Sequence, residues 1–365
     1  MIVLEVLLCV LLERPDSRAF KDEADIDIYM KRTAWVGSSG VRPYRDVFQE
    51  YPPLGAYYLA IPRVFSDERE GYAAVFYGLG GLLLLSMVWL VARAARSALP
   101  GRRALSVLAL AAPCVLYYGV NRYDALPAVL LLGALIALTR GREGLSAALF
   151  GLAIGVKWYP VAVGPLMLVL VRRRIRWLAI AGGVAALTCL HPMLYAGVDP
   201  VLESYRFHLG RGANPGSLYD ILLLSFPGLI RQDEMVKRLL LALQVAPGLI
   251  AAGIAVRRRI GPERLLEVCA LAFAAVAGFT LFARFHSPQW HVWLAPFVAL
   301  CGSLPITAYF LVADLLLYAS VPLIWNLIGP RSVAMVTVST LYYVVLGHAI
   351  VFALLRRGVP RQEET

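Results

Sequence analysis

The chain has 365 residues, of which 59% are hydrophobic and 16% charged, and it carries a formal net charge of +11. Soluble domains contain about 25% charged residues, so this composition, with a mean hydropathy of +0.68, excludes a soluble enzyme, a disordered chain and a fibrous protein. The excess arginine lies in short clusters between long apolar runs. That pattern is typical of the cytoplasmic loops of a membrane protein, and we expect no nucleic-acid partner.

The first apolar run, residues 1–12, is shorter than the roughly 20 residues that span a bilayer. It lacks a basic segment in front and a cleavage site behind, so we do not expect a signal peptide. We expect a helix that continues into the following residues or begins upstream of Met1. The five cysteines lie in apolar stretches without CxxC spacing, which predicts neither disulfides nor a zinc site.

Residues 13–71 form a predicted outer loop that is too long for a simple connector, which points to function. Within it, residues 25–36 are expected to form an amphipathic helix on the membrane interface, capped by Asp22 or Glu23. Its expected apolar face comprises Ile28, Trp35 and Val36. Proline-containing turns follow, and a second apolar helix is expected over residues 54–65.

Further apolar segments follow, separated by arginine clusters or by polar turns. They cover residues 72–92, 104–120, 125–139, 145–171, 177–195, 238–256, 265–283, 292–304, 306–325 and 332–355. With the first run, they predict an all-α polytopic membrane protein with about 11–12 transmembrane helices in one integral membrane domain, residues 1–365. Placing the arginine clusters in the cytoplasm puts both termini there, and it makes 196–237 a second long outer loop.

Segment 145–171 has arginines at both ends, Arg140 and Arg142 before it and residues 172–176 after it. If both ends are cytoplasmic, the segment is a hairpin of two short helices that turns near Lys157. A turn at membrane depth is tolerated where it lines a cavity or is buried in protein. The outer loops and this turn therefore hold most of the unusual polar residues.

Two carboxylates, Asp25 and Asp27, lie at the start of the amphipathic helix. They can cap the helix and carry solvated charge, or one of them can act as a general base near an outward cleft. Asp25 and Tyr29, four residues apart, share one helical face.

The stretch from Asp25 to Pro62 resembles the first outer loop of GT-C type membrane glycosyltransferases. It is most similar to the bacterial polyprenol-phosphate-mannose-dependent α-mannosyltransferase family. The residues that carry the resemblance are Asp25, Tyr29, Gly40-Val-Arg-Pro43-Tyr44-Arg-Asp46 and Tyr51-Pro52-Pro53, with further echoes in Arg122-Tyr123-Asp124, Lys157-Trp158-Tyr159-Pro160, Ser287-Pro288-Gln289-Trp290 and Trp293.

This resemblance implies a GT-C-like fold and an Asp in the first outer loop as catalytic base, which we assign to Asp25, with Asp27 as a close competitor. It also implies transfer of a hexose, mannose above all, from a polyprenyl-phosphate sugar to a lipid or glycan acceptor. We expect the active site to face outward from the inner membrane, and direct displacement would invert the anomeric centre. We expect no cofactor or metal ion, because cationic side chains are available for the departing phosphate. The residues expected to support the first loop are Tyr29, Tyr44, Asp46, Glu50 and Tyr51.

Lys157 is a lone charge in an apolar run, and its burial would be costly without a partner. It could bind the donor phosphate or extend to the outer interface. For donor binding we favour Arg284, His286, Gln289 and Trp290, with His291 less favoured, although Trp290 and Trp293 could instead form an aromatic belt.

Arg122 and Asp124 lie in a short outer turn and are expected either to pair with each other or to belong to the site. Residues 205–217 resemble a lid or an acceptor contact, without assigned roles. The main alternative to a glycosyltransferase is a lipid-linked glycan flippase or transporter, or a polymerase, and a third is an inactive homologue. A transporter would distribute ionisable residues over many spans, whereas here they gather at one face.

Overall fold

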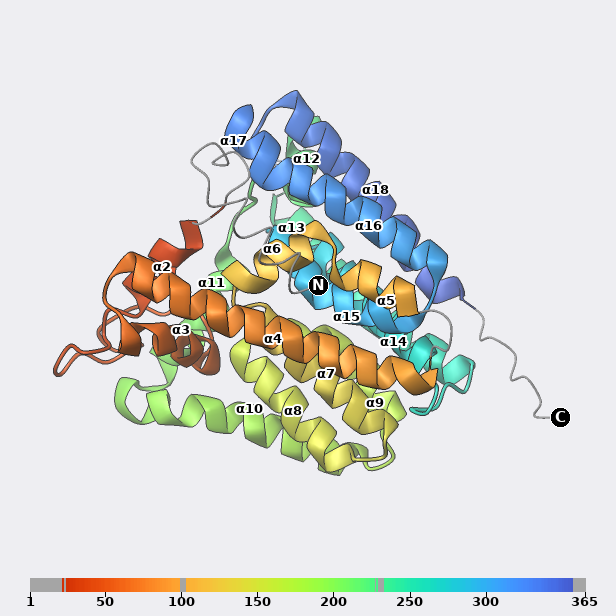
Figure 1. Cartoon of the computed structure of the whole chain (residues 1–365), viewed down its shortest axis with the longest axis horizontal. Coiled ribbons are helices and arrows are strands. Elements are labelled where there is room, and N and C mark those ends of the chain that lie inside the picture. The colour runs from red at the N-terminus through yellow and green to blue at the C-terminus, as the bar shows by residue number, and fades with distance from the viewer. Residues whose placement is uncertain (1–21, 23, 99–102, 227, 229–232, 357–365) are drawn as a thin grey trace.

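The computed structural model describes residues 22, 24–98, 103–226, 228 and 233–356, and this part of the chain is helical, without a β-strand. The predicted all-α class is confirmed, because several of its helices are long and apolar enough to cross a membrane (Figure 1). The first apolar run and both chain ends lie outside these residues.

Five helical segments of the described part pass the length and hydropathy test for a span. They are α4 (Arg69–Ala98), α10 (Arg174–Ala196), α13 (Asp233–Arg257), the segment from α16 (Leu304–Tyr318) through η5 (Ala319–Ile324) to α17 (Trp325–Leu327), and α18 (Val333–Leu355). A sixth is the pair α5 (Arg103–Leu110) and α6 (Pro113–Asn121), bent by 52°.

Shorter apolar helices fill the space between these spans, and the sequence count of about 11–12 includes them. They are α7 (Ala125–Thr139), α8 (Glu143–Val156), η2 (Tyr159–Val163) with α9 (Gly164–Leu170), α14 (Leu265–Leu281) and α15 (His291–Cys301). Every residue of α15 is buried, as expected of a helix that is hydrophobic on all sides and lies in the core. Leu187 of α10 and Leu249 of α13 are instead more than half exposed, as expected for lipid-facing positions.

The predicted hairpin in 145–171 is present. Helix α8 ends at Val156, Lys157 is extended, and α9 brings the chain back to the start of α8. There the carboxylate of Glu143 accepts hydrogen bonds from the backbone N–H groups of Arg172 (2.8 Å) and Arg173 (3.3 Å). The two arginine clusters that flank the hairpin therefore lie at one end of the bundle, as the sequence predicted.

A second contact of this kind joins two other basic segments: Nη1 of Arg258, after α13, donates to the carbonyl of Arg356, after α18 (2.6 Å). Contacts between these basic segments are expected if the arginine clusters lie on the same side of the membrane.

The first outer loop contains α2 (Ala24–Arg32) and α3 (Pro53–Phe65), so both expected helices are present. The expected apolar face of α2 is wrong. Ile26 and Tyr29 are fully buried against α4 and the 122–124 turn, whereas Ile28 is 39% exposed. The helix packs on the bundle instead of lying on the interface. It is rotated about its axis so that Ile26 and Tyr29 join a buried aromatic cluster.

The second long loop also contains helices, α11 (Val198–Gly210) and α12 (Leu218–Ser225), and a short η4 (Pro288–Trp290) precedes α15. Figure 1 shows α2, α3 and α11 near one another at one end of the molecule. Both outer loops thus border the same end.

Candidate active site

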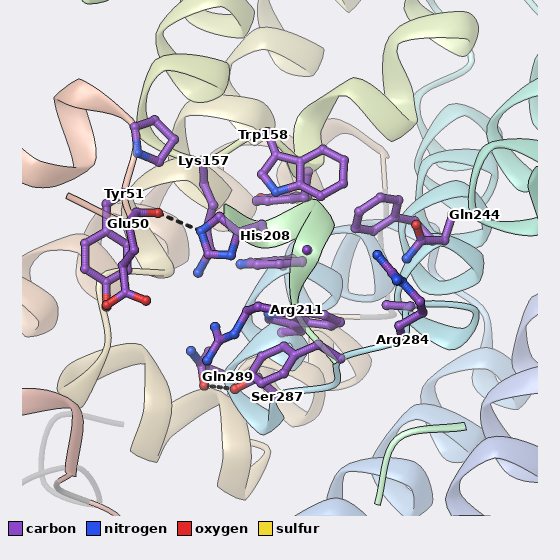
Figure 2. Close-up of a pocket in the computed structure, with 18 of the residues that line it drawn as sticks. Glu50, Tyr51, Lys157, Trp158, His208, Arg211, Gln244, Arg284, Ser287 and Gln289 are labelled. Atoms are coloured by element: carbon purple, nitrogen blue, oxygen red, sulfur yellow. Dashed lines mark hydrogen bonds between the residues drawn. The ribbon is translucent and has the colours of Figure 1, made fainter. Parts of the chain in front are cut away.

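A cavity of about 540 Å³ opens between the two outer loops and the turn at Lys157. This volume is in the range of small-molecule sites. Most of the residues that the sequence singled out line it: Asp25, Tyr29, Glu50, Tyr51, Arg122, Lys157, Arg284, Gln289 and Trp290. Figure 2 shows Glu50 and Tyr51 on one side of this cavity and Arg284 with Gln244 on the other.

One end of the cavity is carboxylate-rich. Oδ2 of Asp25 lies 2.8 Å from Nε of Arg122, and Oδ2 of Asp22 lies 2.9 Å from Nη2 of the same guanidinium. Tyr29 donates a hydrogen bond to Asp25 (3.3 Å). Because one buried guanidinium faces two carboxylates, this group has a net charge of −1 and holds Asp25 at the cavity wall. The sequence suggested only a helix cap for Asp22.

The competing carboxylate, Asp27, lies outside the cavity. Its Oδ1 is 2.8 Å from Nε of Arg69, and its side chain is 63% exposed. Residues two apart on a helix point to different sides, and here Asp25 is the one that faces the cavity.

The first loop is held by contacts of the residues expected to support it. Tyr44 donates to the carbonyl of Tyr51 (2.7 Å), and Glu50 forms an ion pair with Arg32 (3.3 Å). The carboxylate of Asp46 accepts from the backbone N–H of Arg42 (2.8 Å), which closes the turn before Tyr51. Tyr44 has φ +66°, so this turn has a conformation that non-glycine residues rarely adopt.

Lys157 has a partner that the sequence did not identify. Its Nζ lies 2.7 Å from Oδ1 of Asp124, which is fully buried and also accepts from Nε1 of Trp293 (2.7 Å). The expected mutual pair of Arg122 and Asp124 is therefore replaced by two separate pairs. The reason is directional: Arg122 points to the first loop, while Asp124 points to the turn at Lys157. The extension of Lys157 to the interface is not observed.

Cations from other segments also line the cavity: Arg211 of the second long loop, Lys237 and Arg238 of α13, and Arg284 of the loop before α15. The guanidinium of Arg211 lies 4.0 Å from the ring centroid of Phe285, and within the described residues it has no carboxylate partner. Lys237 pairs with Glu234 on α13 (3.0 Å). Arg211 lies in the 205–217 segment that the sequence singled out without assigning roles. The two cations of α13 were not found from the sequence, because they are ordinary basic residues near a helix end.

His208 also lines the cavity, and its Nε2 lies 2.7 Å from the carbonyl oxygen of Glu50. A carbonyl only accepts, so Nε2 carries the proton. Burial lowers the pKa of His208 to about 4, outweighing the hydrogen bond to Glu50 that raises it. His208 is therefore neutral at physiological pH and links the two outer loops.

His286 does not line the cavity, which corrects its expected role in phosphate binding. It is 6% exposed, and neither ring nitrogen has a hydrogen-bond partner in the described part of the chain. Burial, followed by the nearby His291, lowers its pKa to about 3. A neutral, buried imidazole cannot neutralise a phosphate. His291 is buried deeper, against Asp314 (2.9 Å).

Trp290 and Trp293 do not form an aromatic belt, because they are only 9% and 2% exposed. They stack on each other with ring centroids 5.1 Å apart, and Trp293 stacks on Tyr159 at 3.9 Å. These rings form one wall of the cavity, which extends from residues 288–293 to the turn at Lys157.

The loop that carries Arg211 is fixed to the loop that carries Arg284. The side-chain amide of Asn214 donates to the carbonyl of His286 (2.6 Å) and accepts from its backbone N–H (2.8 Å). Tyr343 of α18 donates to the carbonyl of Gly216 (3.2 Å). These loops are therefore held by hydrogen bonds from side chains to the backbone of segments far apart in the sequence.

Ionisable groups of both signs line this one cavity. Comparison with curated proteins finds no match. The model of glycosyltransferase family 87 matches residues 48–288, which include the turn at Lys157, Arg211 and Arg284, while α2 with Asp25 precedes the match. Since this match covers more than half of the chain, the protein belongs to glycosyltransferase family 87 and is a membrane glycosyltransferase.

Proposed function

We propose that the protein transfers a hexose from a polyprenyl-phosphate sugar to an outward-facing lipid or glycan acceptor, with inversion. The observation that carries this proposal is that one cavity is lined both by carboxylates of the first loop and by arginines of the second long loop and of the loop before α15. Mannose is the hexose we favour, on the resemblance of the first loop to mannosyltransferases. Family membership favours transfer over a flippase or transporter.

The arginines of the cavity fit the donor phosphate. Arg211 and Arg284 can bind phosphate oxygens through charge-assisted hydrogen bonds, and the phosphate charge grows as it leaves. Trp158, Leu241 and Phe279 give the same part of the cavity an apolar wall, suited to the first isoprene unit. These cations supply the charge that the leaving group needs, so the proposal includes no metal ion or cofactor.

The acidic end fits the acceptor. Asp25 would take the proton of the acceptor hydroxyl as its oxygen bonds to the anomeric carbon, and the bond from that carbon to the phosphate oxygen would break. One displacement inverts the anomeric centre. Arg122 would act through Asp25, as a positioning residue that keeps the carboxylate directed to the cavity.

Lys157 is assigned a different role from the one expected. Because Asp124 already neutralises its charge, Lys157 would fix the turn and the cavity floor, and only its remaining N–H donors would be free for substrate. We place the site on the outer side of the cell membrane, opposite the arginine clusters.

The test is transfer from radiolabelled polyprenyl-phosphate-mannose by purified protein, with other polyprenyl-phosphate sugars as controls. We expect Asp25→Asn to lower the rate by about 10²–10⁴ while donor binding is kept. Asp27→Asn is the matched control, since Asp27 lies two residues away outside the cavity, and it should retain the parent rate. Parent turnover by Asp25→Asn, or equal loss in both variants, would refute Asp25 as the base. Failure of every polyprenyl-phosphate donor would refute the donor class.

A further inference from the structure

A second cavity, of about 390 Å³, lies at the opposite end of α8 from Lys157. It is bordered by the turn between α7 and α8 and by the turn between α9 and α10. Helix α8 has 14 residues, so the two cavities are separated by about 20 Å along its axis. The second cavity thus takes no part in the proposed transfer reaction.

The walls of this cavity are fixed. Glu143 joins the two turns through the backbone N–H groups of Arg172 and Arg173. The buried indole of Trp177 packs on Phe150 (centroids 4.9 Å apart) and lies within hydrogen-bonding distance of Ser146 (3.3 Å). The two turns that border the hollow are therefore joined to each other, and the lining arginines extend from them as exposed side chains.

Its charge is strongly positive. Four arginines line it, against a single carboxylate, Glu143, whose oxygens already accept from the backbone. The lining arginines are Arg142, Arg172, Arg173 and Arg176. Within the described residues, their guanidinium groups form no ion pair or hydrogen bond with a side chain or a carbonyl. Membrane topology alone predicts arginines on this side of the membrane, but not four of them around one hollow.

The flanks of the cavity are apolar and exposed. Leu145 on α8 is 48% exposed, and Leu178 on α10 is 50% exposed, next to the partly buried Ile180 in the lining. Clustered cations beside such apolar helix faces match a ligand with an anionic head and hydrocarbon chains, because the head meets the arginines while the chains follow the helices.

We propose that this cavity binds the phosphate headgroup of an anionic phospholipid, in the membrane leaflet on the arginine-rich side. The bound lipid would bridge the α7–α8 and α9–α10 turns and so stabilise the base of the hairpin that carries Lys157 at its other end. A free phosphate shares the headgroup chemistry, and the experiment separates the two. The proposal depends on the membrane topology and not on the transfer reaction.

The experiment measures the midpoint temperature of thermal unfolding and the bound lipid by native mass spectrometry, on the purified full chain. Phosphatidylglycerol is compared with phosphatidylcholine of the same acyl chains and with inorganic phosphate. The variant is Arg173→Gln/Arg176→Gln, and Arg176→Gln alone serves if the double variant does not fold. The control, Arg93→Gln/Arg96→Gln, removes the same charge from α4, outside this cavity.

We expect phosphatidylglycerol, and not phosphatidylcholine, to raise the midpoint of the parent and the control. The double variant should lose this response and bind phosphatidylglycerol at least about 10-fold more weakly, as removal of charge-assisted hydrogen bonds requires. Equal responses of variant and control would overturn the proposal in favour of diffuse surface charge. Equal protection by inorganic phosphate would overturn the assignment to a lipid.

Discussion

Replacing Lys157 by Met is expected to destabilise the protein more than it weakens donor binding. Lys157 and Asp124 form a pair in which the carboxylate is fully buried and the lysine side chain is 14% exposed. Without Lys157, the carboxylate of Asp124 keeps the Trp293 indole as donor but no adjacent positive charge. Removing one partner of a buried pair typically costs about 3–5 kcal/mol.

A double-mutant cycle measures this coupling. The variants are Lys157→Met, Asp124→Asn and the combination, which leaves no buried charge, and each is unfolded thermally in detergent. Because the Asn amide oxygen can still accept from Trp293, the combination should recover most of the loss, with a coupling energy of about 2 kcal/mol or more. Asp27→Asn, which leaves a partner exposed at the surface, should change stability by less than about 1 kcal/mol.

The result that would refute this reasoning is a Lys157→Met protein as stable as the parent, with additive effects in the double variant. If such a protein also showed a raised KM for the donor, Lys157 would act on the phosphate directly, and its contact with Asp124 would be incidental.

Three further outcomes follow from contacts at the cavity and beside it. Asn214→Ala removes two hydrogen bonds to His286 and should raise the donor KM about 10-fold or more with little change in protein yield, whereas Asn214→Asp, which keeps one acceptor, should be milder. His208 has a pKa of about 4 in the folded chain, below the unfolded value of about 6.5. Its contribution to stability is therefore present above pH 6.5 and lost as pH falls toward 4, and in His208→Gln the unfolding midpoint should change less with pH between these values. Gly248→Ala would drive a Cβ into the carbonyl oxygen of Ala162 and should lower the midpoint of unfolding, because a backbone atom cannot easily give way.

The helices were predictable because their signals are local. Apolar runs bounded by arginines identified the spans, and the rule that both ends of 145–171 lie on one side identified the hairpin before any contact was known. The same reasoning placed Asp25, Lys157 and Arg284 near one another. Topology brings outer loops together, and unusual polar residues in such loops tend to meet.

The interaction partners of the site residues were less predictable than the positions of these residues in the fold. Sequence proximity suggested that Arg122 pairs with Asp124, but the ionic partners lie 97 and 33 residues away from them, at Asp25 and Lys157. His286 and Trp290 are close in sequence, yet a single turn places one outside the cavity and the other in its wall. Such differences depend on side-chain direction after tertiary packing, which local pattern does not encode.

The hairpin within 145–171 has a consequence for how the protein is assembled in the membrane. A continuous helix over this segment would be long enough to cross the bilayer, and every loop after Val171 would then lie on the opposite side. What opposes this inverted form is the pairing of Lys157 with Asp124 and the contact of Glu143 with Arg172 and Arg173. The orientation of the second half of the chain thus depends on contacts that a few polar residues make during insertion.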